Sequence, residues 1–209
     1  MNYRQIIITA IILLLFTVVG TSMVAFTYDG TREKIAANER ATLQRKLNQL
    51  LPPGSYDNSL LDDRIRVTLP DATDRDNAIT VYRARRNNAD AGLVMTAVAP
   101  DGYSGRIKML VGIRADDTLS GVRIVTHRET PGLGDAIDEQ RTDWVYGFDG
   151  KSLGNPPTEQ WRVKKDGGAF DQLTGATITP RAIVKAVRRT LLYYQANREM
   201  LYTTAPVTE

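Results

Sequence analysis

The chain has 209 residues, of which 42% are apolar and 24% are charged, a composition typical of one globular domain of ordinary size. Its formal net charge is +3, and its basic residues are scattered, so no basic stripe with interleaved aromatic residues indicates nucleic-acid binding. Because it has no cysteine and a single histidine, the chain alone cannot build iron–sulfur, thiolate or multi-histidine metal sites, and any redox chemistry requires an organic cofactor.

The N-terminal segment predicts a membrane anchor. Residues 1–5 contain one arginine, and residues 6–26 contain no charged residue. A helix over 6–26 is about 32 Å long, enough to cross a hydrocarbon core of about 30 Å. A cleaved signal peptide is the alternative, but the apolar run is longer than an h-region of about 7–15 residues and no A-x-A-like site closes it. The charges on either side of the span weakly favour a cytoplasmic segment 1–5 and an exported domain.

Residues 27–58 are predicted to connect this anchor to the domain. Within them, residues 31–51 carry apolar side chains at helical spacing, and the segment Pro52-Pro53-Gly54 is a stop signal. We expect a helix here with no chemistry of its own.

The domain is expected over residues 59–209, as an α+β fold with a mostly antiparallel sheet and flanking helices. Five runs rich in β-branched residues predict strands over 65–69, 79–83, 93–99, 106–113 and 122–127. Turn signals such as Asn87-Asn88 and Pro100-Asp101-Gly102 leave only short links between them, and short links favour antiparallel neighbours.

The C-terminal part predicts two helices and one short strand. Residues 135–148 are predicted to form a helix, and residues 161–164 a strand. The last helix is the clearest element: Thr179 supplies an N-cap, Pro180 occupies the first helical position, and apolar residues recur at threes and fours to about Tyr202.

The segment before that helix is the candidate for chemistry. Residues 171–177 read Asp-Gln-Leu-Thr-Gly-Ala-Thr, so small residues and two threonine hydroxyls precede a helix N-terminus. Unpaired backbone N–H groups and the helix dipole favour a phosphate at this place. The alternative is an ordinary small-residue turn that caps a helix.

The same segment resembles a flavinylation motif, in which a flavin transferase joins FMN to the final threonine. Residues 127–134, His-Arg-Glu-Thr-Pro-Gly-Leu-Gly, resemble the second signature of the FMN-binding domain family. Residues 102–105, 110–113 and Trp144 also match. The resemblance covers essentially the whole chain and is greatest to the G subunits of the Rnf (Rsx) ion-translocating electron-transport complexes.

The resemblance implies covalent FMN, attached by a phosphoester to Thr177, and no metal. The implied cofactor-binding residues are Thr177, Thr174, Gly175, Ala176, Glu129, Thr130, Leu133 and Gly134. The FAD:protein FMN transferase would recognise Asp171, Thr174, Gly175, Ala176 and Thr177. His127 could bind a metal with Glu129, although a structural role is the simpler interpretation, and Trp144 and Trp161 are more typical of a core than of flavin stacking.

The implied function is electron transfer within a ferredoxin- and NAD-linked complex of the bacterial inner membrane, with the domain on the periplasmic side. The implied partners are the other membrane subunits of an Rnf-type complex, and we expect no catalytic residues and no complete active site on this chain alone. One alternative is the C-type subunit of the sodium-translocating NADH:quinone reductase, which shares the domain. Another is a non-redox, membrane-anchored binding or assembly module.

Overall fold

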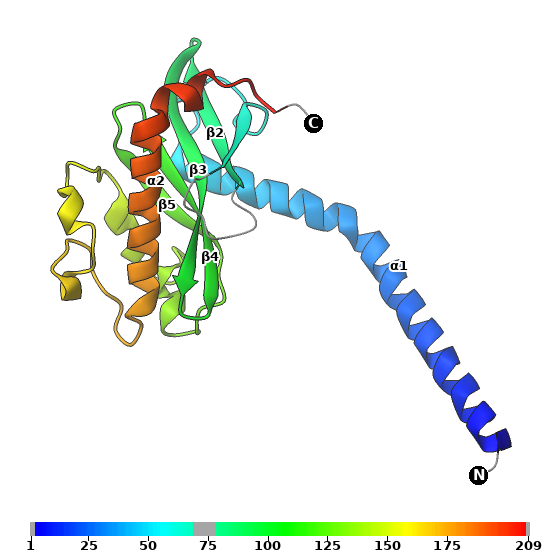
Figure 1. Ribbon diagram of the computed structural model, residues 1–209. Helices are drawn as coiled ribbons and strands as arrows, with labels where there is room; N and C mark the ends of the chain where they lie inside the picture. Colours follow the sequence, from blue (N-terminus) through cyan, green and yellow to red (C-terminus); the bar gives the residue numbers. More distant parts are fainter. Residues whose placement is uncertain (1–2, 69–77, 208–209) are drawn as a thin grey trace. The chain divides into compact units, whose positions relative to one another are not determined.

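The computed structural model describes residues 3–68 and 78–207 of the chain (Figure 1). The chain divides into two compact units, Met1–Gln44 and Arg45–Glu209. The first unit is helical throughout its described residues and belongs to α1 (Tyr3–Leu50). Among the described residues, α1 is the single helix long and apolar enough to cross a membrane, which is consistent with one N-terminal membrane anchor.

The helix predicted over residues 31–51 is confirmed, but no break separates it from the apolar span. α1 is one helix of 48 residues. Gly30 alone does not interrupt it, because a glycine in a helix interior costs only about 1 kcal/mol relative to alanine. The last turn, with Leu47 and Leu50 buried, belongs to the second unit.

The second unit contains a five-stranded antiparallel sheet whose strands lie in chain order, β1-β2-β3-β4-β5. Its strands are β1 (Arg64–Thr68), β2 (Ala78–Arg86), β3 (Ala89–Gly102), β4 (Gly105–Arg114) and β5 (Leu119–Thr126). All five predicted strands and the antiparallel pairing are confirmed, although Leu69, the end of the first predicted strand, lies outside the described residues.

Two tight turns join the central strands. Asn87 and Asn88 have φ values of 52° and 63°, the left-handed pair that a two-residue hairpin between twisted strands requires, and asparagine tolerates it well. The next turn lies at Tyr103-Ser104, because Gly102 pairs with Gly105. The prediction of a turn at residues 100–102 was therefore a few residues early. Those residues end β3 beyond a register shift.

The main core lies between the sheet and α2 (Ile178–Thr203), which Figure 1 shows running along the sheet. Alternate residues of β3, such as Leu93, Met95 and Ala97, are fully or almost fully buried in this core, as the period of a strand dictates. From α2 the same core receives Ile183 and Val187 among others. The helix that carries the candidate motif at its start is therefore fixed to the sheet along its length.

α2 is also held at its C-terminal end. Arg83 is buried, forms an ion pair with Asp63, and donates from Nη1 to the carbonyl oxygens of Tyr202 and Thr204 at 3.1 and 2.6 Å. A cation at this end compensates the unsatisfied carbonyl groups and the negative end of the helix dipole.

Two predicted elements of the C-terminal part were wrong. Residues 135–148 form two short 3₁₀ helices, Gly134–Ile137 and Trp144–Phe148, instead of one α-helix. Asp138 accepts the backbone N–H of Gln140, and Thr142 donates its hydroxyl to Ala136. Such side-chain bonds compete with the helical ladder and explain the interruption.

The strand predicted over residues 161–164 is reduced to one bridge between Val163 and Phe170. Trp161 is instead part of an aromatic cluster that includes Phe148 and Phe170, whose ring centroids lie 4.7 Å apart. Trp144 packs edge-on against Phe148 with centroids at 5.5 Å. The interpretation of both tryptophans as packing residues agrees with these contacts.

Alkaline pH is expected to loosen the contact between α2 and the turn after β4. The buried Tyr194 hydroxyl donates to Asp117 at 2.7 Å and accepts from Arg198 Nε at 3.0 Å. Burial, with help from Asp117, raises the pKa of Tyr194 from 10.0 to about 12. The unfolded chain therefore loses this proton first, so stability falls as the pH rises between about 10 and 12.

Thermal melting followed by circular dichroism at a series of alkaline pH values checks this expectation. Tyr194→Phe should show a smaller fall in Tm across that pH window than the unaltered protein. Part of the fall should persist, because burial also raises the pKa of Tyr202. Identical pH profiles for the two proteins would contradict the assignment.

Candidate functional site

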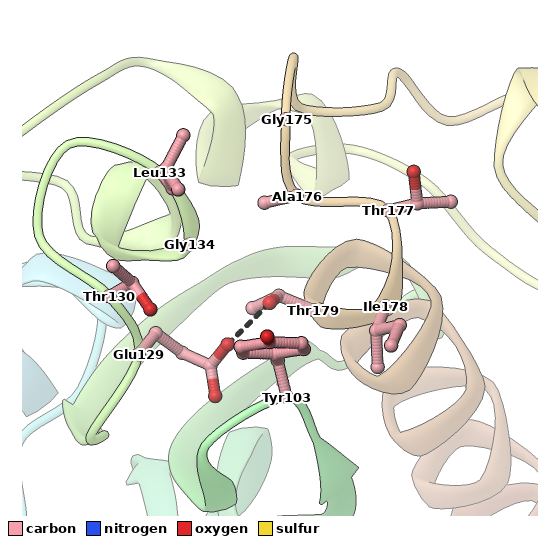
Figure 2. Close-up of a pocket in the computed structure, with 10 residues that line it drawn as sticks. All are labelled: Tyr103, Glu129, Thr130, Leu133, Gly134, Gly175, Ala176, Thr177, Ile178 and Thr179. Carbon is pink, nitrogen blue, oxygen red and sulfur yellow. Dashed lines mark hydrogen bonds between the residues drawn. The ribbon is translucent and has the colours of Figure 1, made fainter.

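A cavity of about 430 Å³ lies at the N-terminal end of α2 (Figure 2). Three segments form it: the β3–β4 turn, the loop after β5, and the residues that lead into α2. The lining residues are Tyr103, Glu129, Thr130, Leu133, Gly134, Gly175, Ala176, Thr177, Ile178 and Thr179. This volume lies within the range of about 300–1,000 Å³ that small-molecule sites occupy.

α2 begins two residues earlier than the sequence predicts, with Thr177 instead of Thr179 as its N-cap. Pro180 is thus the third residue of the helix, which is tolerated because the first four N–H groups of a helix have no intrahelical partner. The Thr177 side chain makes no capping bond, and its hydroxyl makes no hydrogen bond to any other residue that the structure describes. This hydroxyl is therefore available for chemistry at the N-terminal end of α2.

A tight turn presents Thr177 to the cavity. The backbone N–H of Ala176 donates to the Leu173 carbonyl at 3.2 Å, and Gly175 has a φ of +77° at the third position of the turn. A Cβ atom at position 175 would lie 2.8 Å from Leu133 Cδ2. The left-handed backbone conformation therefore favours glycine here, and its missing side chain leaves room for the Leu133 side chain of the opposite loop.

Asp171 lies at the surface, ahead of this turn and outside the cavity lining. Its carboxylate pairs with Lys164 at 2.5 Å, and its backbone carbonyl accepts from Trp144 Nε1 at 2.8 Å. Both side chains of the ion pair are more than half exposed. The segment is thus anchored through the Asp171 main chain, which leaves the carboxylate accessible to another protein.

The loop after β5 forms the opposite wall, and Glu129 is its buried residue at 4% exposure. One carboxylate oxygen, Oε1, accepts the Ser104 N–H at 3.0 Å, and Oε2 accepts the Thr179 hydroxyl. His127 Nδ1 accepts the Glu129 N–H at 3.2 Å, a structural hydrogen bond. Figure 2 shows Glu129 and Thr130 facing the start of α2 across the cavity, with the Tyr103 ring beneath.

The two cations in the first turns of α2 have carboxylate partners. Arg181 Nε donates to Asp166 at 2.6 Å, and Lys185 Nζ donates to Asp101 at 2.6 Å. The hydrogen bond from Arg181 holds the pKa of Asp166 below its usual range. Paired in this way, the two cations leave the backbone N–H groups as the main electropositive feature of the α2 N-terminus.

The structure brings together all but one of the residues predicted to contact a cofactor; Thr174 is exposed in the turn and does not line the cavity. Sequence reasoning missed Tyr103, Ile178 and Thr179 as lining residues. Tyr103 lay within a segment already matched to the family, so that match was a signal for it. Thr179 was interpreted as a cap, and its actual role depends on its hydrogen bond with Glu129.

Comparison with known proteins gives two family matches. Residues 102–192 match the FMN-binding domain family, and residues 1–50 match the RnfG N-terminal region. The first match covers the whole cavity lining. The second covers α1 almost entirely.

Full-length relatives give the same result. The chain is 48% identical over 198 residues to the G subunit of the ion-translocating oxidoreductase complex of Pseudomonas aeruginosa, covering 95% of this chain and 92% of the relative. It is 47% identical over 203 residues to the corresponding protein of Pseudoalteromonas atlantica, covering 97% and 94% of the two chains. For Aliivibrio fischeri the identity is 45% over 195 residues, with 93% of each covered. The chain therefore belongs to the family of G subunits of the ion-translocating oxidoreductase (Rnf) complexes and carries an FMN-binding domain.

Proposed function

We propose that this chain carries FMN joined through its phosphate to the Thr177 hydroxyl oxygen and relays electrons within a multi-subunit, ion-translocating complex. The observation that carries the proposal is the position of Thr177. Its hydroxyl has no partner among the described residues, and it lies at a helix N-terminus that opens into a cavity of ligand size.

The start of α2 fits the phosphate. A phosphodiester keeps one negative charge, and the unpaired N–H groups and positive dipole of a helix N-terminus stabilise such a charge. Gly175 and Ala176 carry little or no side chain on the approach to Thr177, so a bulky group can lie against the main chain.

The remainder of the cavity fits a flat aromatic ring. Tyr103, Leu133 and Ile178 line it and are 68%, 43% and 46% exposed, so they present apolar surface that a ring would cover. Glu129, Thr130 and Gly134 supply the polar edge and the closely approaching backbone of the opposite wall. When bound, the flavin would supply reversible electron uptake and release.

Attachment requires a second protein. The Thr177 oxygen would form a bond to the FMN phosphorus of FAD while the pyrophosphate bond to AMP breaks, and the hydroxyl proton would leave to a base. No titratable side chain is hydrogen-bonded to Thr177 in the described part of the chain, which fits a base supplied by the FAD:protein FMN transferase. The exposed Asp171 carboxylate, with Thr174 and Gly175 in the adjoining turn, fits a surface that this transferase recognises.

The complex would be that of the bacterial inner membrane, with residues 6–26 as the single span and the domain on the periplasmic side. Its other membrane subunits would exchange electrons with the flavin, between ferredoxin and NAD⁺. A role as the C-type subunit of the sodium-translocating NADH:quinone reductase is disfavoured, because the similarity to G subunits extends over 95% of the chain.

Intact-mass measurement of the protein extracted from its native membrane tests the proposal. The expected mass is that of the amino-acid chain plus one FMN less one water, lost on forming the ester. A non-redox assembly module predicts a colourless protein with the mass of the chain alone, and that result would overturn the proposal. Protein made without the transferase is not a valid sample, because it cannot acquire the group.

A further inference from the structure

The Glu129 carboxylate joins the three segments that form the cavity. Glu129 lies in the loop after β5. Its carboxylate accepts one hydrogen bond from the N–H of Ser104 in the β3–β4 turn and another from the hydroxyl of Thr179 in the first turn of α2. Figure 2 draws the second of these bonds as a dashed line across the base of the cavity. Both oxygens are thus used in bonds within the protein.

Two glycines leave room for this carboxylate. A Cβ atom at Gly134 would lie 2.9 Å from Glu129 Oε2, and one at Gly102 would lie 3.0 Å from Oε1. Close packing on both sides excludes water from the carboxylate, which is 4% exposed as a residue. The two donors therefore take the place of the hydration that burial removes.

Thr179 connects the bridge of hydrogen bonds through Glu129 to Thr177, the proposed attachment position. It is the second residue of α2, two positions after Thr177, and its own side chain is buried at 1% exposure. A hydrogen bond from its hydroxyl to a buried carboxylate fixes the direction in which the first turn of the helix leaves the turn at Gly175. The position of Thr177 relative to the opposite wall depends on that direction.

We propose that Glu129 is a positioning residue that acts through Thr179: it holds the first turn of α2 against the β3–β4 turn and thereby sets where Thr177 accepts the flavin. This inference rests on the proposed function for its effect on flavin transfer. The bridge is made by protein atoms alone, so its mechanical role can be measured separately.

The rate at which purified transferase, with FAD, loads the apoprotein tests the proposal, with intact mass as the readout. Thr179→Val keeps the shape and removes the donor, and it is expected to slow loading about tenfold. Thr179→Ser restores the donor and should recover most of the rate. Thr190→Val is the matched control, because Thr190 is buried in the same helix and, among the residues that the structure describes, its hydroxyl bonds only to the Ala186 carbonyl.

A double variant shows whether Glu129 acts through Thr179. Glu129→Ala is expected to slow loading. Adding Thr179→Val to it should lower the loading rate by less than the product of the two single fold-decreases, because both changes remove the same hydrogen bond. A Thr179→Val protein that loads at the unaltered rate would overturn the proposal. So would a Thr179→Ser protein as slow as Thr179→Val.

Hydrogen–deuterium exchange of the apoprotein distinguishes this inference from the proposed function. The Ser104 amide and the first turn of α2 should exchange faster in Thr179→Val than in Thr179→Ser or Thr190→Val. If unaltered protein never takes up flavin, the proposed function fails, and the exchange result still decides the role of Glu129. Equal exchange in all variants would refute that role.

Discussion

Replacing Thr177 with alanine is expected to abolish flavin fluorescence that survives denaturing electrophoresis. The hydroxyl oxygen is the atom that would form the phosphoester, and no other described residue of the cavity places a hydroxyl at the N-cap of α2. Because the Thr177 side chain makes no hydrogen bond in the described structure, its removal should leave the fold intact. The protein should therefore melt normally while its mass lacks the increment.

Thr174→Ala is the control for this variant. Thr174 lies in the same turn, is exposed, and does not line the cavity, so its loss should reduce fluorescence at most, through weaker recognition by the transferase. Both variants have to be expressed with the transferase in the native compartment. Full denaturation-resistant fluorescence of Thr177→Ala would show that the attachment site is elsewhere.

Replacing Phe148 with alanine is expected to give the largest loss of stability. Its ring is fully buried and stacks on Phe170, with the ring centroids 4.7 Å apart. The centroid of the Trp161 ring lies 6.4 Å away. Truncating such a residue removes apolar contacts and leaves a cavity, which lowers the free energy of unfolding by about 3–5 kcal/mol. For a unit of this size, Tm should fall by about 10 °C.

The Phe148 variant has a second expected effect, on flavin loading. Trp144 packs against Phe148 and donates to the Asp171 carbonyl, so loss of the ring loosens the start of the motif segment.

Leu192→Ala is the matched control for the loss of stability, because Leu192 is 43% exposed on α2, and its truncation should change stability by no more than about 0.5 kcal/mol. Calorimetric melting of both variants checks the difference, and similar Tm values would contradict the buried role of Phe148.

The sheet could be predicted because each strand has a local signature. The β-branched runs, the alternation along β3 and the Asn87-Asn88 turn all lie within short windows of sequence, and the strands then pair with their neighbours in the chain. Short antiparallel links remove most of the topological freedom that a sequence leaves open. The two long helices were also predictable, the apolar part of α1 from its uncharged length, and the rest of α1 and α2 from their periodicity.

The elements that were predicted incorrectly depend on side-chain hydrogen bonds, some of them local and one of them distant in sequence. The apolar spacing of residues 135–148 is compatible with an α-helix, but the side chains of Asp138 and Thr142 bond to nearby backbone groups and interrupt it. Likewise, Thr179-Pro180 is a good helix start by local rules. The true start at Thr177 leaves the Thr179 hydroxyl to Glu129, fifty residues earlier in the chain.

The two walls of the candidate site could be identified from their motifs, because each is a contiguous segment with unusual small residues. The third wall, at Tyr103, could not be assigned to the site by any periodicity, since a hairpin turn carries no sign of what it faces. The pairing of β3 with β4 determines where that turn lies. Contributions of this kind follow from the assembled sheet and not from local sequence.

The order of the elements along the chain has a consequence for biogenesis. β1 to β5 can pair successively as they emerge during synthesis or translocation, because every partner is the preceding strand. The cavity, in contrast, needs α2, the last element, to pack against segments made much earlier. The proposed flavin transferase, if it recognises the folded turn, would thus meet an incomplete substrate until nearly the whole polypeptide has been made. Cofactor insertion would then act as a checkpoint on finished chains.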